Sequence, residues 1–464
     1  MQKDFQSKLM NRDLTQGPVM RSMLSFAVPM ILGNLLQQCY NIADTLIVGR
    51  FLGRDALAAV GASFTLMTFL TSILLGLCMG SGALFSIRFG RGDEEGLRES
   101  IRAAFVLIAS ATLALGACAF ACIDLIRLFL RVPDEVWPLM RVYLLIIFCG
   151  IPATFLYNYF ASLLRALGNS VVPLVFLAVS AGGNILLDLW FVLGLRLGVA
   201  GAAAATVIAQ TVSGVGIAAY ARVCCPQLRS DGKKRRIRWR CIRDIAGFSI
   251  LTCVQQSVMN LGILMVQGLV NSFGAAVMAA FAAAVKIDAF AYMPVQDFGN
   301  AFSTFIAQNY GAGKTARIRA GMRGAAGAAA LFCVTVSALV CAFARSLMLL
   351  FVDAGETAII QEGVRYLRIE GAFYVGIGCL FLLYGLYRAL GRPGTSVVLT
   401  VISLGTRVAL AYILSSIPAI GVQGIWWSVP IGWLLADVTG GIYYALRRDR
   451  LLPGGGRPPS DAQG

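Results

Sequence analysis

The chain has 464 residues, of which 58% are hydrophobic and only 13% are charged, and its formal net charge is +16. A soluble domain averages roughly 25% charged residues, and the mean hydropathy of +0.76 points in the same direction. These values exclude a soluble domain and predict an integral membrane protein. Apolar runs of about 20 residues or more recur along the whole chain, which predicts membrane-spanning helices. A β-barrel would show alternating segments of about 10 residues instead.

The first 21 residues are polar and are expected to be a cytoplasmic lead-in rather than a cleavable signal. Twelve apolar stretches follow and predict twelve transmembrane helices. They lie near residues 22–49, 57–87, 101–126, 139–164, 171–193, 198–221, 244–271, 276–307, 318–344, 359–387, 395–417 and 421–446. The expected organisation is therefore a lead-in (1–21), a first six-helix lobe (22–221), a basic loop (222–243), a second lobe (244–446) and a tail (447–464).

The distribution of lysine and arginine predicts the orientation. The termini and the loops after even-numbered spans hold most of the 39 basic residues, which places both termini in the cytoplasm. The loop at 222–243 is the most basic segment, and nucleic-acid or anionic-lipid binding is one interpretation of it. The other interpretation is that the loop anchors the chain at the membrane surface and links the two lobes. We favour it because the topology accounts for the whole net charge of +16. No nucleic-acid partner is expected.

An internal repeat divides the chain into two halves. Four pairs of segments match at offsets of 221 to 223 residues, and an even number of spans in each half gives both halves the same orientation. The axis that relates the lobes is therefore a pseudo-two-fold axis along the membrane normal, an arrangement typical of alternating-access transporters. The matching pairs are 163–170 with 386–393, 197–207 with 420–430, 89–95 with 310–316, and 50–63 with 271–284.

Two motifs that would indicate other chemistry fail on inspection. The segment "QNYGAGKT" (308–315) is one residue away from a nucleotide-binding P-loop, because Gln308 stands where the motif requires glycine. No strand is predicted before it, so a tight cytoplasmic turn is expected there and an ATP-driven pump is disfavoured. The 12 cysteines are scattered without C-x-x-C pairs, and the chain has no histidine. No zinc site, haem site or other cofactor is therefore expected.

Ionisable and polar residues inside the first predicted span form the strongest functional signal. A charge at membrane depth costs at least a few kcal/mol, so its presence there is a functional hypothesis. Gln37, Asn41 and Asp44 recur on one face of the helix, with Tyr40 beside them. Pro29 removes a backbone donor and can bend the same helix.

Asn184 and Asp188 lie one helical turn apart in the fifth span, and Thr206 lies in the sixth. Carboxylate, amide and hydroxyl oxygens suit a hard cation such as Na⁺, or a shared proton. The alternative is a satisfied hydrogen bond between helices. At the repeat-equivalent positions the second half has Met265 and Ala411 instead of the two acids, which favours a coupling site confined to the first lobe.

The second half has polar residues of its own within predicted spans. Lys286 and Asp288 could neutralise each other, or they could pair with Asp297 or with acids across a cavity. Arg407 could pair with Asp437. Structural pairing and a proton relay both remain open for this group. The candidates for residues that line a cavity in this lobe are Gln255, Lys286, Asp288, Asp297 and Arg407.

At these residues the sequence resembles the multidrug and toxic compound extrusion (MATE) family over essentially its whole length, and most closely the DinF-like branch. The pieces that carry the resemblance are the first span with Pro29 and Asp44, "GNILLD" with Asn184 and Asp188, "AAAATVIAQ" with Thr206, and "AFSTFIAQNYGAG" (301–313). The resemblance implies twelve helices in two lobes around a large central cavity. It also implies that Asp44, Asn184, Asp188 and Thr206 form a first-lobe cation site, and that Pro29 is the bending point of the first span.

One departure concerns the seventh span, where the NorM-like branch places an acid. Here that span offers Gln255, Gln256, Asn260 and Gln267, which argues against a second-lobe cation site of that kind. The expected function is secondary active export of organic cations or amphiphilic drugs against H⁺ or Na⁺, by a monomer in a bacterial inner membrane. Export of lipid-linked or other endogenous metabolites is the alternative, and a membrane-embedded enzyme is a distant one.

Overall fold

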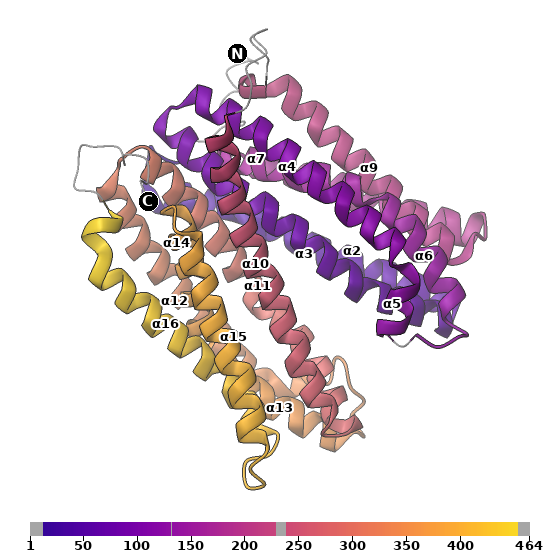
Figure 1. Ribbon diagram of the computed structural model, residues 1–464. Coiled ribbons are helices and arrows are strands. Elements are labelled where there is room, and N and C mark those ends of the chain that lie inside the picture. The colour runs from indigo at the N-terminus through magenta and orange to yellow at the C-terminus, as the bar shows by residue number, and fades with distance from the viewer. Residues whose placement is uncertain (1–12, 131, 229–237, 453–464) are drawn as a thin grey trace. The chain divides into compact units, whose positions relative to one another are not determined.

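The computed structural model describes residues 13–130, 132–228 and 238–452, and every regular element in them is helical (Figure 1). The elements of the first half are α2 (Val19–Leu52), α3 (Arg54–Arg91), α4 (Glu94–Ala121), α5 (Ile123–Leu130), α6 (Trp137–Cys149), α7 (Ile151–Ala166), α8 (Val171–Leu189), a π-helical turn η1 (Trp190–Gly194), α9 (Gly198–Cys224) and a 3₁₀ turn η2 (Pro226–Leu228). Those of the second half are α10 (Trp239–Asn271), α11 (Ala275–Gly311), α12 (Thr315–Met348), α13 (Thr357–Gly371), α14 (Tyr374–Ala389), α15 (Pro393–Ser415) and α16 (Gln423–Leu451).

The prediction of twelve spans is confirmed, but two of the spans are broken. In the described part of the chain, ten helices are long and apolar enough to cross a membrane, and two bent helix pairs complete the twelve. The pair α6 and α7 bends by 45°, and the pair α13 and α14 bends by 50°. At the first break, Gly150 separates the helices, and Pro152 in the first turn of α7 has no backbone N–H to continue the ladder. The sequence predicts both pairs as continuous helices.

The chain folds into two compact units. Unit 1 is built mainly from residues 28–89 and 93–253, and unit 2 mainly from residues 14–27 and 254–464. Two helices belong partly to each unit. The boundary lies between Ala27 and Val28 in α2, and between Cys253 and Val254 in α10. The first division lies next to Pro29, the proline inside α2.

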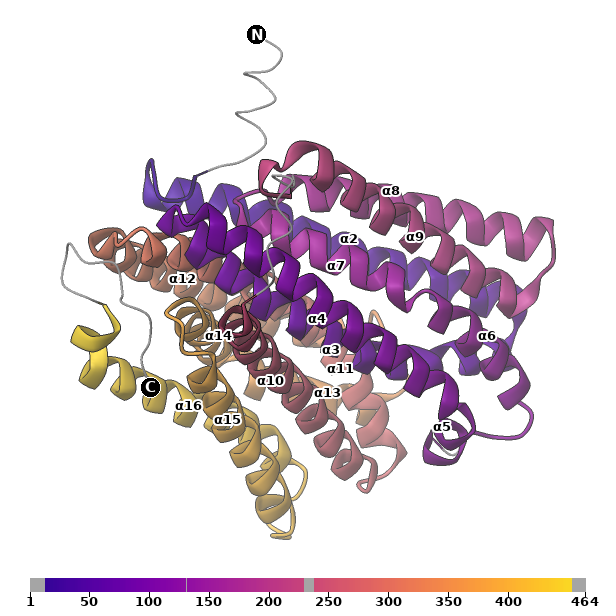
Figure 2. The same ribbon diagram turned by 45° about the horizontal axis from the view of Figure 1, so that its top comes forward.

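The core of unit 1 is formed mainly by α3, α4, α6 and α7, with residues of α9 and of the start of α10. Helix α9 packs along α7 and α8, and α4 packs against α7 (Figure 2). Tyr159 of α7 is 1% exposed, and its ring meets Phe85, Phe105 and Phe155. Its hydroxyl donates a hydrogen bond to the backbone carbonyl of Ile101 at 2.6 Å, so this large buried side chain leaves no polar atom unpaired.

Two glycines allow α3 to touch the backbone of α10. A Cβ atom added at Gly76 would lie 2.6 Å from Cys253 Cα, and one added at Gly80 would lie 2.3 Å from the Phe248 carbonyl oxygen. The two glycines are four residues apart and form the G-x-x-x-G pattern that brings membrane helices together. The next residue, Ser81, hydrogen-bonds Ser249 at 2.7 Å between buried hydroxyl groups.

The segment before α2 is fixed to the turn between α11 and α12. Leu14 N donates to Gln308 Oε1 at 3.2 Å, and Lys314 Nζ donates to the Thr15 carbonyl at 2.8 Å. The Arg317 guanidinium donates to the Gly17 carbonyl at 2.7 Å. Basic and amide side chains of the second half thus hold the backbone of the segment that precedes the first helix.

The segment before α10 has an equivalent attachment with the opposite charge pattern. Arg238 lies 222 residues after Gln16, in the register of the repeat, and it binds Glu99 of α4 through both its backbone N–H (2.6 Å) and its guanidinium (2.7 Å). Arg238 lies outside the spans, and this hydrogen bonding raises its pKa. In each half of the chain, a residue just before the first long helix is therefore held by side chains of the other half.

The core of unit 2 is aromatic at one end. Helix α15 packs along α16, and α11 packs along α14 (Figure 1). The rings of Phe281 and Trp426 stack at 5.4 Å, and Tyr366 meets both of them edge-on. This cluster joins α11, α13 and α16 one turn away from the buried Glu370.

Candidate functional site: a buried carboxyl pair in unit 1

Asp44 of α2 and Asp188 of α8 meet inside unit 1. The two carboxyl groups lie within hydrogen-bonding reach of each other, and Asp188 is 0% exposed. Two carboxylates cannot donate to one another, so this contact requires a proton between them or a cation beside them. The structure therefore brings together two acids that are 144 residues apart in the sequence.

Asn184, one turn before Asp188, contacts Thr206 of α9. Asn184 Nδ2 donates to Thr206 Oγ1 at 3.3 Å, and the Thr206 hydroxyl donates to the Ala202 carbonyl at 3.1 Å. The amide oxygen of Asn184 is buried and accepts no hydrogen bond. The same is true of Asp44 Oδ1 and of both carboxyl oxygens of Asp188. Buried acceptors without donors are costly, and here four of them belong to three neighbouring residues.

The local backbone sets the direction of these side chains. The π-helical turn η1 begins at Trp190, two residues after Asp188, and such turns occur frequently at functional sites. An apolar cluster lies one turn beyond the acids, with Val48 following Asp44, Val192 following Asp188, and Ala202 preceding Thr206 by four residues. The polar groups therefore stand next to a packed apolar layer that excludes water on one side.

Three further side chains adjoin the pair, and only one of them is predicted from the sequence. Tyr40 lies one turn before Asp44, close to both acids, and hydrogen-bonds Gln210. Gln210 Oε1 also accepts a hydrogen bond from Thr154 Oγ1 at 2.7 Å. Tyr143 of α6 lies near the same acids. Gln210 stands four residues after Thr206, so helical spacing could have indicated it, whereas nothing in the sequence singles out Tyr143.

The remaining residues of the polar stripe on α2 lie elsewhere. The side chain of Gln37 is exposed, and Asn41 Nδ2 donates to Gln38 Oε1 on its own helix at 3.2 Å. Asp44 and Tyr40 are therefore the members of the stripe that the structure joins to Asp188. The spacing of Gln37, Asn41 and Asp44 describes a face of the helix, but the contacts of the neighbouring helices select which part of that face forms the site.

No basic side chain neutralises this pair within the described residues. Among the described residues, the charged groups that act on Asp44 and Asp188 are the two acids themselves. The same part of the chain contains no group of three or more His, Cys, Asp or Glu residues placed to hold a metal ion. The arrangement can take up and release one positive charge. A proton would supply a hydrogen bond to these buried oxygens, and a metal cation would be coordinated by them.

Unit 2 contains a second buried acid pair at different positions. Asp288 of α11 and Glu370 of α13 are 4% and 2% exposed and lie within reach of each other, and Tyr374 contacts Asp288. Here the Arg407 guanidinium is close enough to act on both acids. The break between α13 and α14 follows Glu370 directly, which the sequence does not predict. A basic side chain therefore stands near this pair, in contrast to the pair in unit 1.

The other candidates of the second half are placed separately. The side chain of Lys286 is exposed, and in the described part of the chain no ion pair joins it to Asp288, because residues two positions apart point in different directions on a helix. Asp437 contacts Cys379, whereas Arg407 faces the acids. Asp297 and Gln255 are each 3% exposed. The structure thus places Arg407 near enough to Asp288 to act on it electrostatically, whereas Lys286 is exposed.

The near-match to a P-loop forms a turn between two helices. Helix α11 ends at Gly311 and α12 begins at Thr315, with Gly313 at φ 69° between them, and the segment is preceded by a helix. The prediction of a tight turn is confirmed. Lys314, which a P-loop would direct at phosphate, donates to Thr15.

We expect Lys314→Ala to leave transport largely intact, because Arg317 retains its bonds to the Gly17 and Leu14 carbonyls. Export by the variant in liposomes and ATP hydrolysis by the native chain are the measurements. A complete loss of export, together with ATP hydrolysis by the native chain, would identify this turn as a nucleotide site.

Comparison with known proteins gives consistent matches. The model of the MatE family matches residues 29–190 and 250–413. A protein of Bacillus subtilis described as probable multidrug resistance protein YpnP is 30% identical over 437 residues, which cover 94% of this chain and 97% of that protein. The multidrug export protein MepA of Staphylococcus aureus is 22% identical and covers 94% of this chain and 96% of its own length.

Solved structures show the same fold. A multidrug resistance MATE family transporter of the MOP superfamily, in an outward-facing conformation, superimposes with a TM-score of 0.88 at 22% identity and covers 95% of this chain and 98% of its own. A MOP superfamily transporter from Pyrococcus furiosus gives a TM-score of 0.87 at 23% identity, with the same coverage. The two-lobe helical architecture is therefore shared.

Proposed function

The chain belongs to the MatE family of multidrug efflux transporters, and from this premise we propose that it is a secondary active exporter that couples outward movement of organic cations or amphiphilic drugs to inward movement of protons. Membership of the family makes the chain a multi-pass membrane transporter and not an enzyme. The names of YpnP and MepA support drug export. The observation that carries the coupling is the contact between Asp44 and Asp188.

The geometry of this contact favours the proton over Na⁺. One proton between two carboxyl groups satisfies an oxygen of each and leaves one negative charge to be compensated. The Asn184 amide oxygen and the Thr206 hydroxyl offer additional ligands, and these would serve Na⁺ if it were the coupling ion. The absence of a nearby basic residue among the described groups supports exchange of the charge, since an arginine in contact would hold the pair permanently ionised.

The acids of unit 2 are assigned a structural role. The Arg407 guanidinium near Asp288 and Glu370 can balance one of their two negative charges. Breaking one member of such a group leaves a buried charge uncompensated and is strongly destabilising. We therefore place coupling in unit 1, with the termini in the cytoplasm and the spans in a bacterial inner membrane, as the basic residues indicate.

Reconstitution in liposomes tests the coupling ion. We expect efflux of a fluorescent organic cation to follow an imposed pH gradient and to be unchanged by a Na⁺ gradient at equal pH. Efflux driven by the Na⁺ gradient alone would assign the four oxygens to Na⁺ instead. Efflux without either gradient, or none under both, would contradict secondary active export of such compounds.

A further inference from the structure

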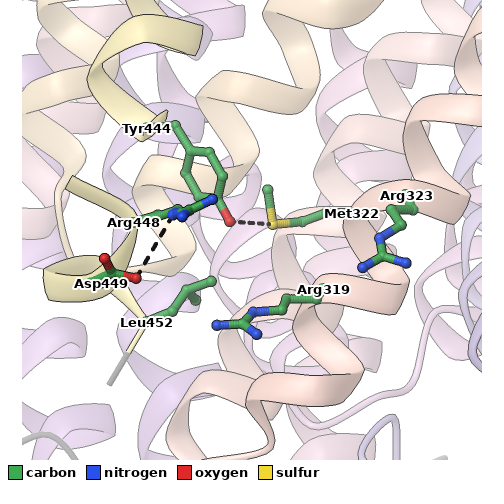
Figure 3. Close-up of a pocket in the computed structure, with 7 residues that line it drawn as sticks. All are labelled: Arg319, Met322, Arg323, Tyr444, Arg448, Asp449 and Leu452. Carbon is green, nitrogen blue, oxygen red and sulfur yellow. Dashed lines mark hydrogen bonds and ion pairs between the residues drawn. The ribbon is translucent and has the colours of Figure 1, made fainter. Parts of the chain in front are cut away.

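A basic pocket lies between the first turns of α12 and the last turns of α16, within unit 2 (Figure 3). It has a volume of about 470 Å³, within the range of small-molecule sites, and is therefore larger than a single phosphate group requires. Its charged residues are Arg319 and Arg323 of α12 and Arg448 and Asp449 of α16. Arg319 and Arg323 are four residues apart and share one face of α12. We call this site the α12–α16 pocket.

The charges in this pocket are not balanced. Asp449 lies 3.8 Å from Arg448 and is its neighbour in the chain. In the part of the chain that the structure describes, neither Arg319 nor Arg323 forms an ion pair with a carboxylate. Three guanidinium groups against one carboxylate leave the pocket with two positive charges in excess. This excess matches a ligand that carries two negative charges.

The floor of the pocket is apolar, and it contains one hydroxyl group, that of Tyr444, whose present hydrogen bond is weak. Leu452 is 3% exposed, and Met322 lies between the two arginines of α12 in the sequence. The Tyr444 hydroxyl donates to the Met322 sulfur at 3.5 Å, and a thioether is a weak acceptor. Figure 3 shows this hydroxyl between the two helices. A phosphate oxygen would be a better acceptor for it, and arginine forks are suited to binding phosphate with two hydrogen bonds.

The position of the pocket indicates a lipid. It lies at the start of one candidate span and the end of another, where basic residues predict the cytoplasmic membrane surface. Ile442, two residues before Tyr444, and Leu446, between Tyr444 and Arg448, are 55% and 79% exposed, so acyl chains can lie beside the pocket. Helix α12 packs on α11, α13 and α14, and α16 packs on α13, α14 and α15. A headgroup in the pocket would therefore join two helices that have few contacts with each other.

We propose that the α12–α16 pocket binds the headgroup of an anionic phospholipid that carries two phosphate groups. Arg319 and Arg323 bind the phosphates, Arg448 completes the cationic rim, and Tyr444 transfers its hydrogen bond from Met322 to a phosphate oxygen. Basic pockets between transmembrane helices are a common means of recognising such headgroups. This inference does not depend on the proposed transport function.

Thermal unfolding of the purified full-length chain in detergent, followed by tryptophan fluorescence, tests the proposal. The probes are cardiolipin, a zwitterionic phosphatidylcholine and inorganic pyrophosphate. We expect cardiolipin to raise the unfolding midpoint in a saturable manner, whereas phosphatidylcholine and pyrophosphate have little effect. Arg319→Gln with Arg323→Gln should weaken the apparent affinity for cardiolipin by about tenfold or more, because charged hydrogen bonds to the phosphates are lost.

The matched control is Arg447→Gln with Arg450→Gln. Like the test variant it removes two positive charges, but from residues at the end of α16 that do not line the pocket. The control should bind cardiolipin like the native chain. An equal loss in both double variants would show attraction by surface charge alone and overturn the proposal. Protection by pyrophosphate equal to that by cardiolipin would indicate a soluble ligand and also overturn it, as would a native chain that does not distinguish cardiolipin from phosphatidylcholine.

Discussion

Asp188→Asn and Asp44→Asn are each expected to reduce gradient-driven export to background while the protein still inserts and folds. Asparagine keeps the shape of the carboxyl group but cannot take up and release a proton, so the coupling step is lost. The thermal midpoint should stay at or above that of the native chain, because a buried charge without a basic partner is removed. Substrate accumulation in liposomes and the unfolding midpoint are the two measurements.

The repeat supplies matched controls for this experiment. Met265→Leu and Ala411→Ser, at the positions in the second half that correspond to Asp44 and Asp188, should export at native levels. Asp288→Asn provides a contrast, since it removes one of the two acids near the Arg407 guanidinium and should lower the thermal midpoint. If both carboxyl variants of unit 1, expressed at native levels, still build a substrate gradient, the coupling site lies elsewhere.

Gly80→Leu is expected to prevent α3 and α10 from packing and to abolish most of the folded protein. Even a single Cβ atom at this position would lie 2.3 Å from the Phe248 carbonyl oxygen and 2.6 Å from Ser249 Cα. These are backbone atoms, which cannot rotate away as a side chain could, so the helices must separate and the hydrogen bond between Ser81 and Ser249 is lost. Overpacking typically costs about 1–3 kcal/mol and occasionally more. The folded fraction in size-exclusion chromatography and the thermal midpoint measure the effect.

Gly61→Ala is the control on the same helix. No atom outside the helix's own backbone and its chain neighbours lies within 4 Å of the Cβ position there. Replacing a helical glycine by alanine where there is space should stabilise by about 0.5–1 kcal/mol. A normal yield and midpoint for Gly80→Leu would mean that the close approach of α3 to α10 contributes little to the folded state.

Composition and periodicity predict the number of spans and the polar residues, because both depend on single segments. Asp44, Asn184, Asp188 and Thr206 could be selected because polar side chains are conspicuous in apolar spans, and the structure places Asp44 beside Asp188 and Asn184 beside Thr206. The breaks within the fourth and tenth spans, and the π turn after Asp188, depend on local geometry that hydropathy does not reveal.

Other features depend on which helices become neighbours. Tyr143 is an ordinary aromatic residue until α6 brings it next to the acids. Glu370 could not be placed in depth from the sequence, yet the structure buries it beside Asp288. Lys286 is a plausible partner of Asp288 by proximity in the sequence, and the direction of side chains on a helix rules out that pairing. Helical spacing limits the possible contacts, but the packing partners select among them.

The close packing of α3 against α10 has a consequence for how the protein is made. Gly80 leaves the ribosome about 170 residues before its contacts at Phe248 and Ser249, a delay on the order of 10–30 s at ~5–20 residues per second. The segment at 14–17 waits longer still, for Gln308, Lys314 and Arg317. Unit 1 is therefore not complete when the first half has been translated, because it extends to Cys253. The half-made protein thus exposes the glycine face of α3 within the bilayer, where an insertion chaperone would have to shield it until α10 arrives.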